Sequence, residues 1–134
     1  MKSGKQETVP IASSSDVVLA RQKVRQWALE MKFTLVDQTK LVTAASELAR
    51  NALEHGKGGH MVIEQVENSV KNGLKLVFED QGPGIPDIEA ALRDGFTTGG
   101  GMGLGLGGSK RLVNDFHVES QPGKGTRVTV VRWK

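Results

Sequence analysis

The chain has 134 residues, with 18 Lys and Arg against 15 Asp and Glu, a formal net charge of +3 and no cysteine. This length suits a single domain over residues 1–134, and the lack of cysteine excludes disulfides, thiolate zinc sites and cysteine nucleophiles. Aromatic residues make up only 4% and apolar stretches are short, so we expect a cytoplasmic protein that binds neither nucleic acid nor membranes.

The first half of the chain predicts one strand followed by two helices. Residues 7–12 are expected to form an edge strand, because Pro10 cannot donate a hydrogen bond to a neighbouring strand. Apolar residues recur at helical spacing over about 16–31, which predicts an amphipathic helix. A second helix is expected over about 35–55, and Gly56 ends it.

The second half predicts four strands, two short helices and a glycine-rich loop. The expected elements are strands over 60–67, 74–80, 116–120 and 126–133, and helices around 87–93 and within 104–116. Helices come in groups and do not alternate with strands. We therefore expect an α+β fold, a two-layer sandwich of helices on a mixed, largely antiparallel sheet.

Two polar residues of the second helix, Glu47 and Asn51, lie four positions apart and so point to one face. One interpretation is an ordinary solvated helix face. The other is a shared cleft, in which the amide oxygen of Asn51 binds a hard cation such as Mg²⁺ and the carboxylate of Glu47 accepts a proton.

An acidic pair and a turn rich in glycine and proline follow the strand that ends at residue 80. The sequence is EDQGPGIP, starting at Glu79. Such residues are common where a strand ends in a turn. Alternatively, Asp80 accepts a hydrogen bond from the amino group of a base, while Gly82 and Gly84 let the backbone approach the ring.

Eight of the 17 glycines lie between Gly95 and Gly108. They contain the spacing GxGxxG, but no strand directly precedes it, and the P-loop order of Gly, Lys and Ser or Thr is absent. The HRD and DFG motifs of common protein kinases are also absent. The stretch is typical of a lid whose amides approach phosphates, and Lys110 and Arg111 are either phosphate contacts or surface charges.

Together, four motifs in this order resemble the nucleotide-binding boxes of the GHKL ATPases, the superfamily of gyrase, Hsp90, histidine kinases and MutL. ELARNALEHG is similar to the N box, EDQGPGIPD to G1, GGGMGLGL to G2, and GKGT, by itself a hairpin turn, to the terminal Gly-Thr motif. The resemblance covers roughly residues 34–134. Within it, the chain looks most like the anti-sigma serine/threonine kinases, particularly the stressosome switch kinases of the RsbT type.

On the phosphate side, the resemblance implies a Bergerat-type site with ATP and Mg²⁺. Asn51 would ligate the Mg²⁺ that bridges the phosphates, and Glu47 would be the general base for the attacking hydroxyl. Gly101, Gly103 and Gly105 would belong to the ATP lid.

On the base side, Asp80 would read the adenine amino group, with Gly82 and Gly84 close to the ring. Thr126 would assist adenine recognition. Lys110 and Arg111 are our own additions to the nucleotide-binding set.

The implied reaction is transfer of the ATP γ-phosphoryl group to a Ser or Thr of a STAS-domain antagonist in a bacterial sigma-factor or stress-response partner-switching pathway. Further partners would be a sigma factor or a PP2C-type phosphatase. The alternative is an ATP-dependent binding module, an anti-sigma factor or phosphatase activator with little kinase activity. A complete histidine kinase is excluded because no His precedes His55, which belongs to the N box, although a detached catalytic fragment is not.

Overall fold

The computed structural model describes residues 2–84 and 106–134, and the helix expected at 87–93 lies outside this part of the chain. The elements are β1 (Lys2–Ile11), α1 (Ser14–Glu30), α2 (Leu35–Glu54), β2 (Gly59–Glu67), β3 (Asn72–Asp80), α4 (Leu106–Arg111), β4 (Asp115–Ser120) and β5 (Thr126–Trp133). The predicted order of strands and helices is confirmed for the described residues.

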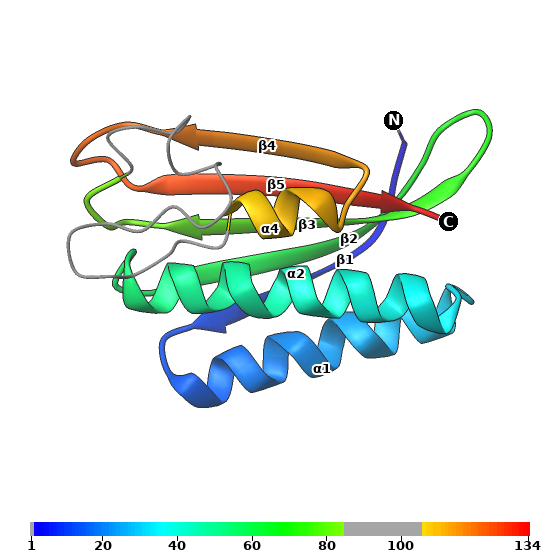
Figure 1. The fold of residues 1–134 in the computed structure, drawn as a ribbon, viewed down its shortest axis with the longest axis horizontal. Helices are drawn as coiled ribbons and strands as arrows, with labels where there is room; N and C mark the ends of the chain where they lie inside the picture. The colour runs from blue at the N-terminus through cyan, green and yellow to red at the C-terminus, as the bar shows by residue number, and fades with distance from the viewer. Residues whose placement is uncertain (1, 85–105) are drawn as a thin grey trace.

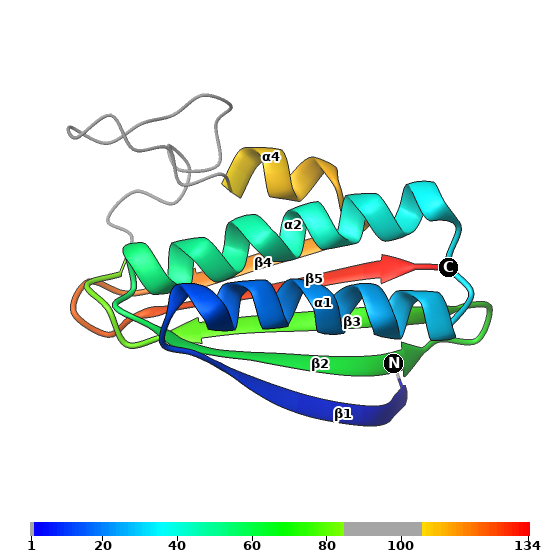
Figure 2. The same ribbon diagram turned by 90° about the horizontal axis from the view of Figure 1, so that it is seen from below.

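Five strands form one sheet in the order β1-β2-β3-β5-β4, and every described pairing is antiparallel (Figure 1). The described helices lie on one face of this sheet (Figure 2), so the predicted α+β sandwich is confirmed. Pro10 lies in β1, opposite His60, and β1 is an edge strand as predicted. β1 begins at Lys2 and not at residue 7, because pairing with β2 extends a polar segment that has no apolar alternation.

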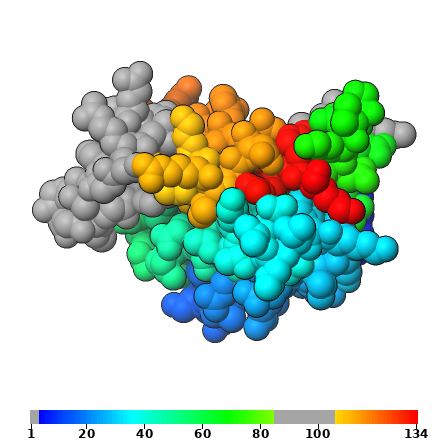
Figure 3. Space-filling model, turned by 45° about the vertical axis from the view of Figure 1, so that its right-hand side comes forward, coloured from blue at the N-terminus to red at the C-terminus, as the bar shows by residue number. Residues whose placement is uncertain are grey.

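The core lies between the helices and the inner face of the sheet. α2 presents a stripe of small residues to the strands, which lets the helix approach closely, and Figure 3 shows α1, α2 and α4 side by side on one face. The largest fully buried apolar side chains come from β1, both long helices and the inner faces of β2, β3 and β5: Ile11, Val24, Leu41, Leu48, Met61, Ile63, Leu74, Leu76 and Val130.

The residues that begin and end the helices act in the structure as the sequence suggests. The hydroxyl of Thr34 caps α2 by accepting a hydrogen bond from the backbone N–H of Asp37 at 3.1 Å. After α2 the chain turns through Lys57 and Gly58, which have φ values of 60° and 95°. α4 was expected in the later part of residues 104–116 but lies in the earlier part and ends at Arg111, because the next residues turn to enter β4.

Both described ends of the chain lie at one end of the sheet (Figure 1). Lys2 pairs with Glu67 at the end of β2, and the backbone N–H of Lys134 donates to the carbonyl of Asn72 at 2.8 Å. Asp80 lies at the opposite end of β3. Among the described helices, none has the length and apolarity needed to cross a membrane.

Candidate functional site

Asp80 is the last residue of β3, and its side chain lies where three segments of the chain meet. Its Oδ1 accepts a hydrogen bond from the backbone N–H of Gly82 at 2.9 Å, and the carboxylate also accepts one from the backbone of Thr126, its partner in β5. Burial raises the pKa of Asp80, and this effect outweighs the two backbone hydrogen bonds, which lower it. Asp80 is therefore a half-buried acceptor at the edge of the core.

Three glycines near Asp80 occupy positions where a side chain would collide with neighbouring atoms. A Cβ on Gly56, just after α2, would overlap the carboxylate of Asp80. A Cβ on Gly82 would lie 2.5 Å from the Cα of Gly56. Gly125 has φ +85°, and its Cβ would overlap the carbonyl of Asp80. Glycine at these three positions thus lets the end of α2 and two turns pack closely around Asp80.

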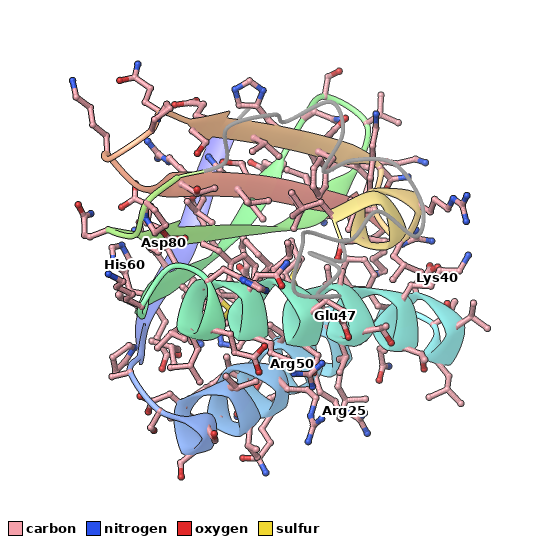
Figure 4. The ribbon with its side chains drawn as sticks, turned by 60° about the vertical axis from the view of Figure 1, so that its left-hand side comes forward. Arg25, Lys40, Glu47, Arg50, His60 and Asp80 are labelled. Atoms are coloured by element: carbon pink, nitrogen blue, oxygen red, sulfur yellow. The ribbon has the colours of Figure 1, made fainter. Side chains whose placement is uncertain are left out.

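Glu79 and Asp80 have opposite orientations although they are neighbours in sequence. Successive strand residues face opposite sides of a sheet, so Glu79 lies on the outer face. There its carboxylate contacts His60 at 3.2 Å and Arg127 at 3.3 Å. Figure 4 shows His60 and Asp80 at the same end of the molecule. Of the acidic pair, only Asp80 faces the helix layer.

The hydroxyls of Thr126 and Ser120 lie on the next two strands after Asp80, Thr126 on the adjacent strand β5 and Ser120 on β4 beyond it. The two oxygens are 2.9 Å apart, and the Ser120 hydroxyl also donates to the carbonyl of Gly125 at 3.1 Å. Asp80, Ser120 and Thr126 line an open hollow of about 280 Å³ at the end of the sheet. Charged side chains from β3, β4, β5 and the turn before β5 complete its rim: Glu79, Glu119, Lys124 and Arg127.

Asn51 and Glu47 occupy the last turns of α2. The carbonyl of Asn51 accepts hydrogen bonds from the N–H groups of His55 and, at 3.1 Å, of Gly56, the glycine that touches Asp80. α2 therefore brings Asn51 within one turn of the glycines around Asp80. Glu47 lies one further turn away, near the middle of α2 (Figure 4).

Glu47 faces solvent on the side of α2 that borders α1. Its Oε1 lies 3.2 Å from Nη1 of Arg50, and the two side chains are 42% and 47% exposed. A hollow of about 550 Å³ between the two helices is lined by Glu47 together with Arg21 and Arg25 of α1. The carboxylate of Glu47 is thus accessible to a large partner.

The remaining residues predicted from the sequence lie away from the Asp80 carboxylate or outside the described part of the chain. Lys110 and Arg111 are exposed on α4, and Lys110 lines a separate hollow with Lys75 and His117. Gly84, with φ +82°, packs against the turn between β4 and β5, where its Cβ would overlap the carbonyl of Gln121. Gly101, Gly103 and Gly105 lie outside the described residues, so their role as lid glycines stays a prediction.

Sequence reasoning gave Gly56 and Ser120 no role in the site. Gly56 was predicted only to end α2, yet a Cβ at this position would overlap the Asp80 carboxylate. Ser120 carries no local signal, because only the register of β4 with β5 places it opposite Thr126.

Asn51 of α2 suits Mg²⁺ bound together with phosphates. Its side chain carries an amide oxygen, a type of ligand that hard cations bind. Within residues 2–84 and 106–134, no group of three or more His, Cys, Asp and Glu side chains gathers into an all-protein metal cage.

Comparisons with known proteins agree with this geometry. A model of the family described as histidine kinase-, DNA gyrase B- and HSP90-like ATPases matches residues 36–134. The chain is 48% identical over 128 residues to the serine/threonine-protein kinase RsbT of Bacillus subtilis (strain 168), covering 96% of each chain. It is 30% identical to an anti-sigma F factor of Thermoanaerobacter sp. (strain X514), covering 92% of this chain and 89% of that one.

A solved structure shares the fold. It contains the RsbU and RsbW domains of a Mycobacterium tuberculosis protein, with a TM-score of 0.66 and 20% identity. The match covers 97% of this chain, which spans 33% of that longer one. The resemblance expected from the four motifs is confirmed, and so is the expected enzyme class, an ATP-using serine/threonine protein kinase. The chain belongs to the family of histidine kinase-, DNA gyrase B- and HSP90-like ATPases.

Proposed function

We propose that this protein transfers the γ-phosphoryl group of Mg²⁺-bound ATP to a Ser or Thr of a STAS-domain antagonist protein, in the cytoplasm of a bacterium that controls a sigma factor or stress response by partner switching. The main observation behind this proposal is the position of Asp80, a half-buried acceptor against which Gly56 packs. The backbone N–H of Gly56 also donates to the carbonyl of Asn51, so Gly56 connects the two residues. The similarity to RsbT and to anti-sigma F factors supports a partner-switching role.

Asp80 binds the adenine in this proposal. Its carboxylate is held by backbone N–H groups, so its orientation is fixed before the nucleotide arrives. It accepts a hydrogen bond from the 6-amino group. Gly56 and Gly82 have no side chain, so the backbone packs tightly beside Asp80 and helps to keep the carboxylate in place. A preformed acceptor of this kind binds without a large cost of reorganisation.

Asn51 and Glu47 act at the phosphate end. Asn51 would hold Mg²⁺, which neutralises charge on the phosphates during transfer. Glu47 accepts the proton of the attacking hydroxyl, and its exposure suits a base whose proton donor belongs to another protein. Lys110, Arg111 and the lid glycines Gly101, Gly103 and Gly105 complete the proposed phosphate-binding set.

The direct test is a phosphotransfer assay. Incubation of the protein with γ-labelled ATP, Mg²⁺ and a purified STAS-domain protein is expected to label the STAS protein on Ser or Thr. The Glu47→Gln variant, which keeps the shape of the side chain, serves as the control that binds but does not transfer. Absence of labelling with every STAS partner that the protein binds would contradict the proposal.

The second candidate is an ATP-dependent binding module that sequesters a sigma factor or activates a PP2C-type phosphatase. It is favoured by the 30% identity to a protein named as an anti-sigma factor. Co-purification separates the two: a kinase is expected to recover a STAS-domain protein and to phosphorylate it. A binding module is expected to hold a sigma factor or phosphatase in an ATP-dependent complex without transfer.

A further inference from the structure

We propose that Ser120 sets the hydrogen-bond polarity of the purine end of the site, so that it selects a purine with a 6-amino group over one with a 6-carbonyl group. The inference rests on the proposed function, which places the base against Asp80. It concerns a residue that contacts Thr126 and acts through it.

The number of available protons decides which group donates and which accepts in the hydrogen bonds of Ser120. The Ser120 hydroxyl lies 3.1 Å from the carbonyl oxygen of Gly125 and 2.9 Å from the hydroxyl of Thr126. A carbonyl only accepts, and a serine hydroxyl has a single proton. Ser120 therefore donates to Gly125, and the Thr126 hydroxyl must donate its own proton to Ser120.

Thr126 is left with lone pairs only. Its one proton is engaged by Ser120, so its oxygen can accept but not donate. Asp80, when ionised, is likewise an acceptor only. The two residues are direct partners in the register of β3 and β5 and share one face of the sheet, so two acceptors lie side by side where the base binds.

This arrangement fits a 6-amino group and opposes a 6-carbonyl group. An amino group donates to the acceptors, whereas a 6-carbonyl oxygen would face two acceptors that have no proton to donate to it. A buried polar group without a partner carries a desolvation cost. Without Ser120, the Thr126 hydroxyl becomes free to rotate and to donate to a 6-carbonyl oxygen.

Inosine triphosphate is the probe, because it replaces the 6-amino group of ATP with a carbonyl, which places a proton on N1, and adds no 2-amino group. Calorimetry with Mg²⁺ would measure the dissociation constants of ATP and inosine triphosphate for the wild-type protein and for Ser120→Ala. We expect the wild-type protein to prefer ATP. Ser120→Ala is expected to lower this preference by about three- to tenfold, mainly through tighter binding of inosine triphosphate.

Two threonine variants test the route through Thr126 and keep the inference testable if Ser120→Ala does not fold. Thr126→Val is expected to lower the preference, because it removes the hydroxyl. Thr126→Ser is expected to keep it within about twofold, since the hydroxyl remains. Thr129→Val, on the same strand but on the outer face, is the matched control and is expected to change nothing.

The double variant decides whether Ser120 acts through Thr126. In the Thr126→Val background, Ser120→Ala is expected to have no additional effect on the preference. A folded Ser120→Ala with wild-type preference, or the same loss with and without the Thr126 hydroxyl, would overturn the inference. Failure of the wild-type protein to bind ATP would instead refute the proposed function.

Discussion

Arg132 of β5 lies 2.6 Å, through Nη2, from Oδ1 of Asp37 in the first turn of α2. Nη1 of the same guanidinium donates to the carbonyl of Leu112 at 3.1 Å, just after α4. The two charged side chains are only 15% and 26% exposed. One arginine thus connects the last strand, the long helix and the segment that follows α4.

The ion pair predicts an acid-sensitive contribution to stability. The hydrogen bond from Arg132 is the main cause that lowers the pKa of Asp37. A carboxyl with a lowered pKa contributes stability above its ordinary pKa and loses it as the pH falls through the folded-state pKa. Asp37→Asn is expected to reduce the free energy of unfolding by about 1–3 kcal/mol at pH 7.

Urea unfolding at several pH values checks this prediction. The difference between the wild-type protein and Asp37→Asn should shrink toward zero once the pH lies below the folded-state pKa of Asp37. Glu54→Gln, an exposed change on the same helix, is the control and should have no comparable effect. A constant difference down to strongly acidic pH would show that the cost comes from packing and not from charge.

Gly56→Ala is expected to impair nucleotide binding. The new Cβ would overlap the Asp80 carboxylate, so either that side chain or the end of α2 must move. We expect ATP affinity to fall by about tenfold or more, which corresponds to at least about 1.4 kcal/mol. Calorimetry with ATP and Mg²⁺ measures it.

The control for Gly56→Ala is Gly108→Ala in α4. A Cβ there meets nothing within 4 Å, and alanine favours the helix by up to about 1 kcal/mol. This variant should bind ATP normally with unchanged or higher stability. Equal loss of binding in both variants would argue against a special role for the glycine beside Asp80.

Glu47→Gln separates binding from chemistry. If Glu47 is the general base, the variant should bind ATP with nearly the wild-type dissociation constant. Its phosphotransfer to a STAS protein should be slower by about 10²–10⁴-fold. Single-turnover kinetics with bound nucleotide measure the transfer step directly. A parallel loss of affinity and rate would place Glu47 in nucleotide binding instead.

Arg50→Gln is the companion to this variant, because Arg50 contacts Glu47. Exposed ion pairs contribute only about 0.2–1 kcal/mol. We therefore expect Arg50→Gln to change the transfer rate by no more than about fivefold, in contrast to Glu47→Gln.

Base selectivity is expected to depend on pH through Asp80. Burial raises the pKa of Asp80, so this carboxyl takes up a proton at a higher pH than an ordinary aspartate does. The protonated form is a donor, which a 6-carbonyl accepts. The preference for ATP over inosine triphosphate should thus fall as the pH is lowered, whereas Asp80→Asn should show a pH-independent ratio. Titrations with both nucleotides at each pH provide the measurement.

The sequence predicted the parts of the fold that depend on local signals. Thr34 and Gly56 mark the two ends of α2, and the turn at GKGT precedes β5 as predicted. The pair Asn72-Gly73, which predicts a hairpin turn from the sequence, instead begins β3: Asn72 pairs with Glu67, and the turn takes residues 68–71. The strand order was not predictable, because the neighbour of β3 is β5 and this contact joins residues some fifty positions apart. The extension of β1 to Lys2 likewise depends on pairing with β2.

In the site, too, local motifs were predictable from the sequence, whereas contacts that depend on strand pairing were not. Motif order pointed to Asn51 and Asp80, and the structure brings both to one end of α2. Sequence alone could not say which carboxylate of the Glu79 and Asp80 pair faces the helices, since that depends on the phase of the strand. Nor could it pair Ser120 with Thr126, a contact made by the register of two strands.

The placement of both chain ends beside the turn between β2 and β3 has a practical consequence. β3 runs from Asn72, which holds the backbone of Lys134, to Asp80, so about 27 Å of extended chain separates the C-terminal residue from that carboxylate. A fluorophore, affinity handle or biosensor tether fused near residue 2 or 134 would therefore leave the opposite pole of the molecule unobstructed for ligand titrations.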